Sequence, residues 1–183
     1  MTASALVGAC GSDSGSSSSG SAAERPSNTA QSCPTAAPSA TVAAGWTLAG
    51  ATGKLSVIGS TATTAPKIAV TTPFSVAETQ VHTLSAGTGE QVSASATVSV
   101  CYVGVDGRTG QVFDSSYERG APESFPVSGV VAGFQKAIVG QRIGSSVGVA
   151  MTSDDGYPDG NPQAGINKGD TLVFELTILS AQE

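Results

Sequence analysis

The chain is poor in charge, in basic residues and in long apolar runs. Only 12% of its 183 residues are charged, against about a quarter in typical soluble domains. With 8 Lys and Arg residues and a formal net charge of −6, it lacks the basic patch that nucleic-acid binding requires, so we expect no nucleic-acid partner. No apolar run approaches the roughly 20 residues of a membrane-spanning helix.

Histidine is nearly absent as well, and this limits the available chemistry. His82 is the one histidine, which excludes a Ser-His-Asp triad in its usual form and a zinc site built on histidines. We interpret it as a surface strand residue. Asp154, Asp155 and Asp159 suggest calcium, but their spacing differs from that of an EF-hand loop. We therefore expect no metal and no cofactor.

Large apolar side chains are scarce in the first 40 residues. Residues 11–21 are almost entirely Gly and Ser, and prolines punctuate the stretch that follows, so this part cannot bury enough surface to fold alone. We expect order to begin near Trp46. The predicted organisation is a short leader at 1–10, a flexible linker at 11–44, an N-terminal strand extension at 45–65 and a folded domain at 66–183. We expect a monomer.

Apolar residues with a period of two indicate an antiparallel sheet beyond residue 45. Short strands are expected at Leu55 to Ile58, Lys67 to Val70 and Pro73 to Val76. Longer alternation follows around Val98 and around Phe174. A single short helix is indicated by apolar residues at helical spacing, which are Val130, Val131, Phe134, Ala137 and Ile138. The pattern predicts an α+β fold in which one helix lies across an antiparallel sheet.

Six segments between Thr97 and Leu179 occur in an order and spacing that resembles the FKBP-type peptidyl-prolyl cis/trans isomerases. Any one of them alone is weak, but the ordered set over about 80 residues is specific. The segments are Val100-Cys101-Tyr102-Val103-Gly104, Val112-Phe113-Asp114-Ser115-Ser116, Val130-Val131-Ala132-Gly133-Phe134, Val139-Gly140-Gln141-Arg142-Ile143-Gly144, Asp154-Asp155-Gly156-Tyr157 and Gly169-Asp170-Thr171-Leu172-Val173-Phe174. The resemblance implies a five- or six-stranded antiparallel sheet wrapped around one short helix.

The resemblance also implies a shallow aromatic pocket for proline-containing peptides. Its members by motif position are Tyr102, Phe113, Asp114, Val130, Val131, Phe134, Tyr157, Ile166 and Phe174. The implied roles fall into three groups. Apolar side chains, namely Phe113, Phe134, Ile166 and Phe174, hold the proline ring. The backbone N–H of Val131 and the hydroxyl of Tyr157 hold the flanking carbonyls. Asp114 lies at the rim, oriented by Tyr102 and paired with Arg119.

Two positions depart from the family pattern. Phe134 stands where the helix usually places Trp, so we expect a working floor of different shape. Glu123 stands where a second aromatic residue is frequent, so we expect a wall that is more open and more acidic. Both changes bear on substrate preference and on the affinity for macrolide inhibitors.

The chemistry needs no nucleophile and no metal. Rotation about an X–Pro bond crosses a barrier of about 20 kcal/mol because resonance holds the bond planar. The twisted transition state loses resonance and much of its charge separation, so an apolar cup favours it over the polar ground state. A thousandfold acceleration needs about 4 kcal/mol of differential stabilisation.

Alternatives remain open at the level of the sequence. Phe113, Phe134 and Phe174, each taken alone, are compatible with an ordinary hydrophobic core. Asp114-Ser115-Ser116 is compatible with a turn cap. Arg119 is compatible with a surface ion pair that contributes little to stability. A second functional hypothesis is an FKBP fold that binds proline segments, as a chaperone, with little turnover. A third, an unrelated β-sandwich lipoprotein, conflicts with the ordered motif set.

The segment Leu6-Val7-Gly8-Ala9-Cys10 resembles a bacterial lipobox. It implies a lipid on Cys10, a bacterial membrane anchor outside the cytoplasm, and unfolded exported proteins as clients. The alternative is a chance cysteine in an unstructured tail. If a lipid occupies Cys10, Cys33 and Cys101 are left as a pair in an oxidising compartment, so we predict a disulfide between them. The competing hypothesis is two free thiols.

Overall fold

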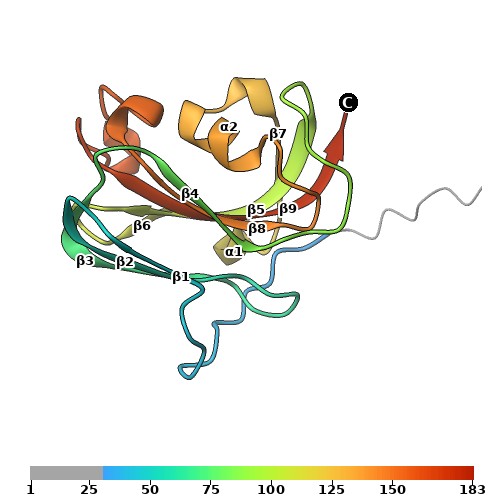
Figure 1. The fold of residues 1–183 in the computed structure, drawn as a ribbon, viewed down its shortest axis with the longest axis horizontal. Helices are drawn as coiled ribbons and strands as arrows, with labels where there is room; N and C mark the ends of the chain where they lie inside the picture. Colours follow the sequence, from blue (N-terminus) through green and yellow to red (C-terminus); the bar gives the residue numbers. More distant parts are fainter. Residues whose placement is uncertain (1–30) are drawn as a thin grey trace, which may run out of the picture.

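The computed structural model describes residues 31–183, which form two antiparallel sheets and two short helices (Figure 1). The main sheet contains β4 (Gln80–Ser85), β5 (Thr97–Asp106), β6 (Val112–Ser115), β7 (Glu123–Pro126), β8 (Ser146–Met151) and β9 (Leu172–Gln182). The smaller sheet contains β1 (Trp46–Ala49), β2 (Thr52–Ile58) and β3 (Lys67–Ser75). The helices are α1 (Ser116–Arg119) and α2 (Ala132–Ile138). Three 3₁₀ turns span Val127–Gly129, Ser153–Asp155 and Pro162–Ala164.

The strand order of the main sheet is β4-β8-β9-β5-β6, and β7 also pairs with β5. The first half of β5 pairs with β7 and its second half with β6. After β6, the chain therefore turns away through α1 and then returns as β7, which pairs with the same edge of β5 as β6 does. The predicted α+β fold, with a short helix across an antiparallel sheet, is confirmed. The four-residue helix α1 is an addition that the apolar spacing did not indicate.

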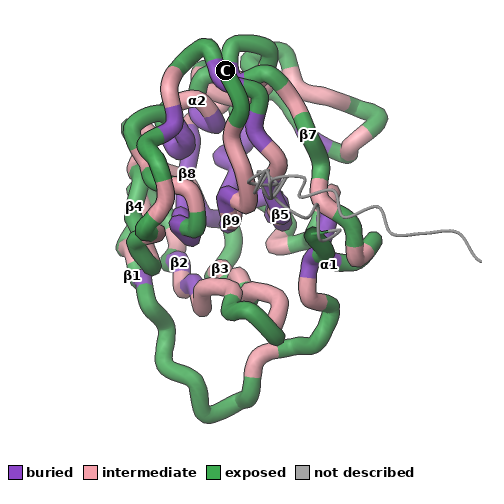
Figure 2. The backbone as a smooth tube through the Cα atoms, turned by 90° about the vertical axis from the view of Figure 1, so that its right-hand side faces the viewer, coloured by how far each residue is buried: buried purple, intermediate pink, exposed green. Residues whose placement is uncertain are grey.

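Helix α2 lies across one face of the main sheet and closes the principal core (Figure 1). Its buried side chains Phe134, Ala137 and Ile138 pack with the core-facing residues of β5, β8 and β9. Every residue of β8 is buried, as the purple tube around β8 in Figure 2 shows. Gly133 lets the helix approach closely, because a Cβ there would lie 2.6 Å from the sulfur of Met151.

The opposite face of the main sheet is also covered, which the strict alternation of the sequence did not predict. The smaller sheet packs on it through Trp46, Leu55, Val57 and Phe74. Beside it, Cys33 and Cys101 form a disulfide with an S–S distance of 2.00 Å and a Cα–Cα distance of 5.6 Å. Both faces of the main sheet are thus covered, and most residues of β9 are buried.

Two expectations about the N-terminal half are wrong. The predicted strands at 67–70 and 73–76 form one strand, β3, because a proline is tolerated in an edge strand. The start of order near residue 45 is also wrong. Cys33 is buried, its N–H donates to the carbonyl of Gly120, and the amide of Ala65 donates to the carbonyl of Ala36. The disulfide holds this segment, so the part of the predicted linker from residue 31 to 36 lies on the folded domain.

The domain boundaries remain predictions, but the pairing bears on the boundary at residue 66. This cut separates β3 from its partner β2. Cys10 and the predicted leader lie outside the described residues. Within residues 31–183, no helix is long and apolar enough to cross a membrane.

Candidate active site

A cavity of about 550 Å³ lies between α2, the end of β6, the start of β7 and β9. All predicted pocket residues line it except Ile166. Ile166 is only 2% exposed and belongs to the principal core, together with Phe134 and Phe174. Its contact with the proline ring stays a prediction. The sequence missed three lining residues, which are Ser124, Phe125 and Gly129.

Four aromatic rings form the floor of the cavity in edge-to-face contact. The ring centroids of Phe134 and Phe174 lie 4.6 Å apart at 87°. Those of Phe113 and Phe174 lie 5.4 Å apart at 90°, and those of Tyr102 and Phe134 5.9 Å apart at 84°. Edge-to-face packing is one of the favoured arrangements of aromatic pairs, and it gives the cavity a largely apolar floor. Phe134 lies in this floor, at the position where the family usually has Trp.

Gly104 on β5 makes this packing possible. It pairs with Phe174 of β9 and with Asp114 of β6. A Cβ at Gly104 would lie 2.6 Å from Phe113 Cζ and 2.6 Å from Phe174 Cε1. Only glycine therefore leaves room for both rings. The sequence contained this glycine within a matched motif, but nothing in the motif indicated its steric role.

Phe125 extends the aromatic wall from β7, with its ring centroid 6.1 Å from that of Phe134. It pairs with Val98 of β5, a residue of the principal core. Because cross-strand partners point to the same face of a sheet, the register of β5 and β7 directs Phe125 towards α2. The strand is four residues long and shows too little alternation for the sequence to reveal this.

A hydrogen-bonded group of Tyr102, Asp114 and Arg119 forms the polar rim, as the family resemblance implied. The Tyr102 hydroxyl donates to Asp114 Oδ2, and Arg119 pairs with Asp114 Oδ1 at 2.6 Å. The guanidinium carbon of Arg119 lies 5.9 Å from the centroid of the Tyr102 ring. Partial burial raises the pKa of the Asp114 carboxyl, but the hydrogen bonds from Tyr102 and Arg119 outweigh it, and the pKa is lowered overall. Asp114 is therefore a carboxylate at neutral pH.

The same contacts keep Tyr102 protonated. Burial and the hydrogen bond to Asp114 raise the pKa of the Tyr102 hydroxyl to about 12. The hydroxyl is consequently a fixed donor that orients the carboxylate. Arg119 has a second carboxylate partner that the resemblance did not imply, because it also pairs with Glu123 at 3.0 Å.

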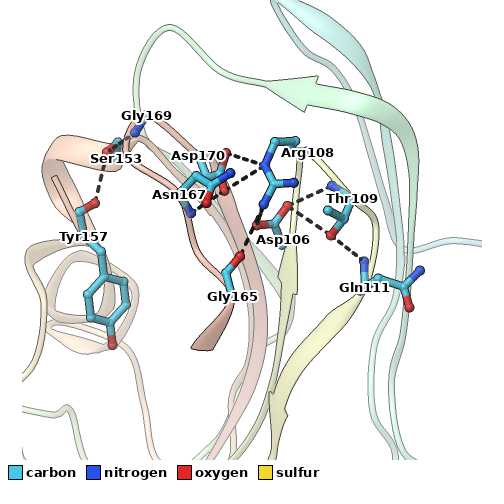
Figure 3. Close-up of polar contacts among 10 residues, drawn as sticks. All are labelled: Asp106, Arg108, Thr109, Gln111, Ser153, Tyr157, Gly165, Asn167, Gly169 and Asp170. Carbon is cyan, nitrogen blue, oxygen red and sulfur yellow. Dashed lines mark hydrogen bonds and ion pairs between the residues drawn. The ribbon is translucent and has the colours of Figure 1, made fainter. Parts of the chain in front are cut away.

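The loop that carries Tyr157 is held by a polar network around Arg108 and Asp170 (Figure 3). Arg108 Nε donates to both carboxylate oxygens of Asp170 at 3.1 Å, and its terminal nitrogen donates to the carbonyl of Gly165. Closer to the cavity, the Ser153 hydroxyl donates to the carbonyl of Tyr157 at 3.1 Å and accepts from the amide of Gly169. Both ends of the loop are thereby tied together.

The resemblance implies that the Val131 N–H and the Tyr157 hydroxyl bind the peptide. Both residues line the cavity. Val131 immediately precedes α2, so its N–H lies before the first helical turn and has no acceptor within the helix. The arrangement combines an apolar floor with a few polar groups at its edge, as in many small-ligand sites.

The described residues that line the cavity include no histidine and no cysteine. His82 lies on β4 and stacks on Trp46 with ring centroids 5.5 Å apart, which confirms it as a strand residue outside the cavity. Among residues 31–183, no group of three or more His, Cys, Asp or Glu side chains is placed to hold a metal. The cavity suits binding and desolvation of an apolar group.

Comparison with known proteins points to one family. Residues 88–179 match FKBP-type peptidyl-prolyl cis-trans isomerases. A probable FK506-binding protein of Corynebacterium glutamicum is 38% identical over 96 residues, which make up 52% of this chain and 80% of that protein. The outer membrane protein MIP of Legionella longbeachae is 33% identical over 106 residues, 57% of this chain but 44% of that protein. A crystal structure of a peptidyl-prolyl cis-trans isomerase from Pseudomonas syringae matches with a TM-score of 0.52 and 27% identity, covering 57% of this chain and 76% of that chain.

Proposed function

This chain belongs to the FKBP-type peptidyl-prolyl cis-trans isomerase family, and we propose that it accelerates X–Pro rotation in exported proteins by desolvating and orienting the bond in the aromatic cavity. The observation that carries the mechanism is the floor of edge-to-face rings bordered by few polar groups. A planar X–Pro amide is polar, and its twisted form is less so. An apolar floor therefore lowers the barrier without a chemical step.

The proposed roles are those that the family resemblance implies, and they are supported by the fact that these residues line the cavity or border it. Phe113, Phe134 and Phe174 hold the proline ring. The N–H of Val131 and the hydroxyl of Tyr157 hold the carbonyls on either side of it. Asp114, fixed by Tyr102 and Arg119, lies at the rim beside the rotating bond.

A protease-coupled assay on an Ala-Leu-Pro-Phe anilide tests this function. The wild type should accelerate isomerisation, and Asp114→Asn, which keeps the shape and removes the charge, should lower kcat/KM several-fold without loss of fold. A matched control is Asp159→Asn, because the Asp159 side chain is 94% exposed and outside the cavity. A wild-type rate equal to the uncatalysed rate, in a folded protein, would favour the second candidate, a proline-binding or chaperone module with little turnover. The open, acidic wall at Glu123 is the feature that favours this second candidate.

The extracytoplasmic, lipid-anchored location is also a proposal. Its support is the lipobox-like segment ending at Cys10, the Cys33–Cys101 disulfide, which suits an oxidising compartment, and the name of the Legionella relative as an outer membrane protein. Metabolic labelling with a fatty-acid analogue should mark the wild type and not Cys10→Ala. Equal labelling of both, or of neither, would remove the anchor.

Macrolide inhibitors are a further proposed ligand class of the same cavity, since the Corynebacterium relative is named a probable FK506-binding protein. We propose that the protein acts as a monomer on unfolded exported chains. Sedimentation of the purified protein tests the oligomeric state.

A further inference from the structure

Two charged side chains line one wall of the cavity, and a third, Arg119, lies behind them without lining the cavity. Asp114 and Glu123 line the cavity, and Arg119 bridges them at 2.6 Å and 3.0 Å. Two carboxylates and one guanidinium leave this wall with one excess negative charge. In the described part of the chain, no lysine or arginine lines the cavity to cancel it.

Glu123 is the carboxylate with capacity for another partner. Both oxygens of Asp114 are engaged, one by the Tyr102 hydroxyl and the other by Arg119. Glu123 Oε1 accepts from Arg119, whereas its second oxygen accepts no hydrogen bond from any residue between 31 and 183. The side chain is 48% exposed, so a cation on a bound peptide reaches it without breaking the existing pair.

An anionic peptide side chain finds no equivalent partner on this wall. The one cation there, Arg119, already binds both carboxylates. The chain as a whole carries a net charge of −6, which adds a repulsive background for acidic segments. The wall therefore discriminates by charge in one direction.

We propose that Glu123 makes the cavity select proline segments with a basic residue next to the proline. This inference rests on the proposed isomerase function and specifies its substrate class. Exposed ion pairs contribute modestly, so the expected preference in kcat/KM is about twofold to fivefold for a cation over a neutral residue of similar shape. Because the pair is exposed, added salt should weaken the preference.

Two peptide series measure the preference. One varies the residue before the proline and the other the residue after it. Each compares Lys with norleucine and Glu with Gln, so that charge changes while shape is nearly kept. The wild type should favour Lys over norleucine and disfavour Glu relative to Gln in at least one series, and both ratios should move towards one between about 20 mM and about 500 mM NaCl.

Glu123→Gln should bring the Lys to norleucine ratio close to one at low salt. The matched control is Glu118→Gln, since Glu118 is an exposed residue of α1 outside the cavity lining and its loss changes the net charge equally. Glu118→Gln should keep the wild-type ratio. Equal ratios in wild type and Glu123→Gln, or the same drop in both variants, would overturn the selection by Glu123. Absence of turnover on the norleucine peptides would instead contradict the isomerase function itself.

Discussion

Gly104 shows how one hydrogen atom determines the shape of the aromatic floor. A methyl group there would lie within 2.6 Å of both Phe113 and Phe174. Gly104→Ala should displace these rings, lower turnover by more than tenfold and destabilise the fold by about 1–3 kcal/mol, as overpacking does. Peptide exchange rates and thermal unfolding of the variant measure both effects. A variant with wild-type exchange rates would show that the floor does not depend on this contact.

The hydroxyl of Tyr157 should contribute less than the floor does. One hydrogen bond is worth about 0.5–1.5 kcal/mol net, so Tyr157→Phe should lower kcat/KM by at most about tenfold. Tyr117→Phe is the matched control, because its hydroxyl binds Glu175 and Thr177 and does not line the cavity. This control should lower stability and leave turnover intact. Loss of turnover in Tyr117→Phe with full turnover in Tyr157→Phe would show that the Tyr157 hydroxyl does not bind the peptide.

Glu175 is a buried carboxyl on β9, outside the cavity lining. It has no exposed surface and lies between Ser146, Ser60 and Tyr117, whose donors approach to 2.6 Å, 2.9 Å and 3.1 Å. Burial raises the pKa of this carboxyl, although these hydrogen bonds oppose the rise. A group whose pKa is raised on folding stabilises the fold below its unfolded pKa and loses that contribution as the pH rises towards the folded pKa.

The free energy of unfolding of the wild type should therefore fall, relative to Glu175→Gln, as the pH rises above about 4.5, the usual value for Glu. Urea unfolding at a series of pH values measures this difference. Carboxyls with lowered pKa, such as Asp114 and Asp155, lose their contributions only as the pH falls, so they do not obscure this window. Parallel curves for wild type and variant would contradict a raised pKa.

At the scale of elements, the disulfide joins the N-terminal segment to the central strand β5. The bridged cysteines are 68 residues apart, so the chain-entropy model gives about 4 kcal/mol of stabilisation. Reduction, or Cys33→Ser, should lower the free energy of unfolding by up to this amount. Thiol titration of the unreduced Cys10→Ala protein should detect no free thiol, and two titratable thiols would contradict the bridge.

The sequence predicted elements whose pattern is local and missed what depends on contacts far along the chain. The alternation around Val98 and the apolar spacing near Phe134 directly indicated a strand and a helix. By contrast, Phe125 faces the cavity because of the β5–β7 register. Glu175 alternates with apolar residues as a solvent-facing residue would, yet Ser60 and Tyr117, both far from it in the sequence, cover it. No window of sequence around either residue contains that information.

In the molecule as a whole, the residues of the cavity and of the principal core all follow the smaller sheet in the sequence. Within the described residues 31–183, the principal core begins at Val92 and the residues that line the cavity all lie between 102 and 174. A fragment of residues 77–183 should therefore fold and retain turnover, with stability reduced by loss of the disulfide and of the cover over Ala150 and Val173. Residues 66–183 should gain little over it, because β3 lacks its partner β2. Urea unfolding of both fragments tests this, and absence of a cooperative transition in 77–183 would make the smaller sheet part of the folding unit.

NMR exchange spectroscopy on a short X–Pro peptide at equilibrium, with catalytic amounts of the protein, tests most directly whether the cavity catalyses isomerisation. We expect cis/trans exchange far faster than the uncatalysed tens to hundreds of seconds, and a return towards the uncatalysed rate in a folded Gly104→Ala variant. Uncatalysed exchange in the presence of folded wild-type protein would show that the cavity is not a catalytic site.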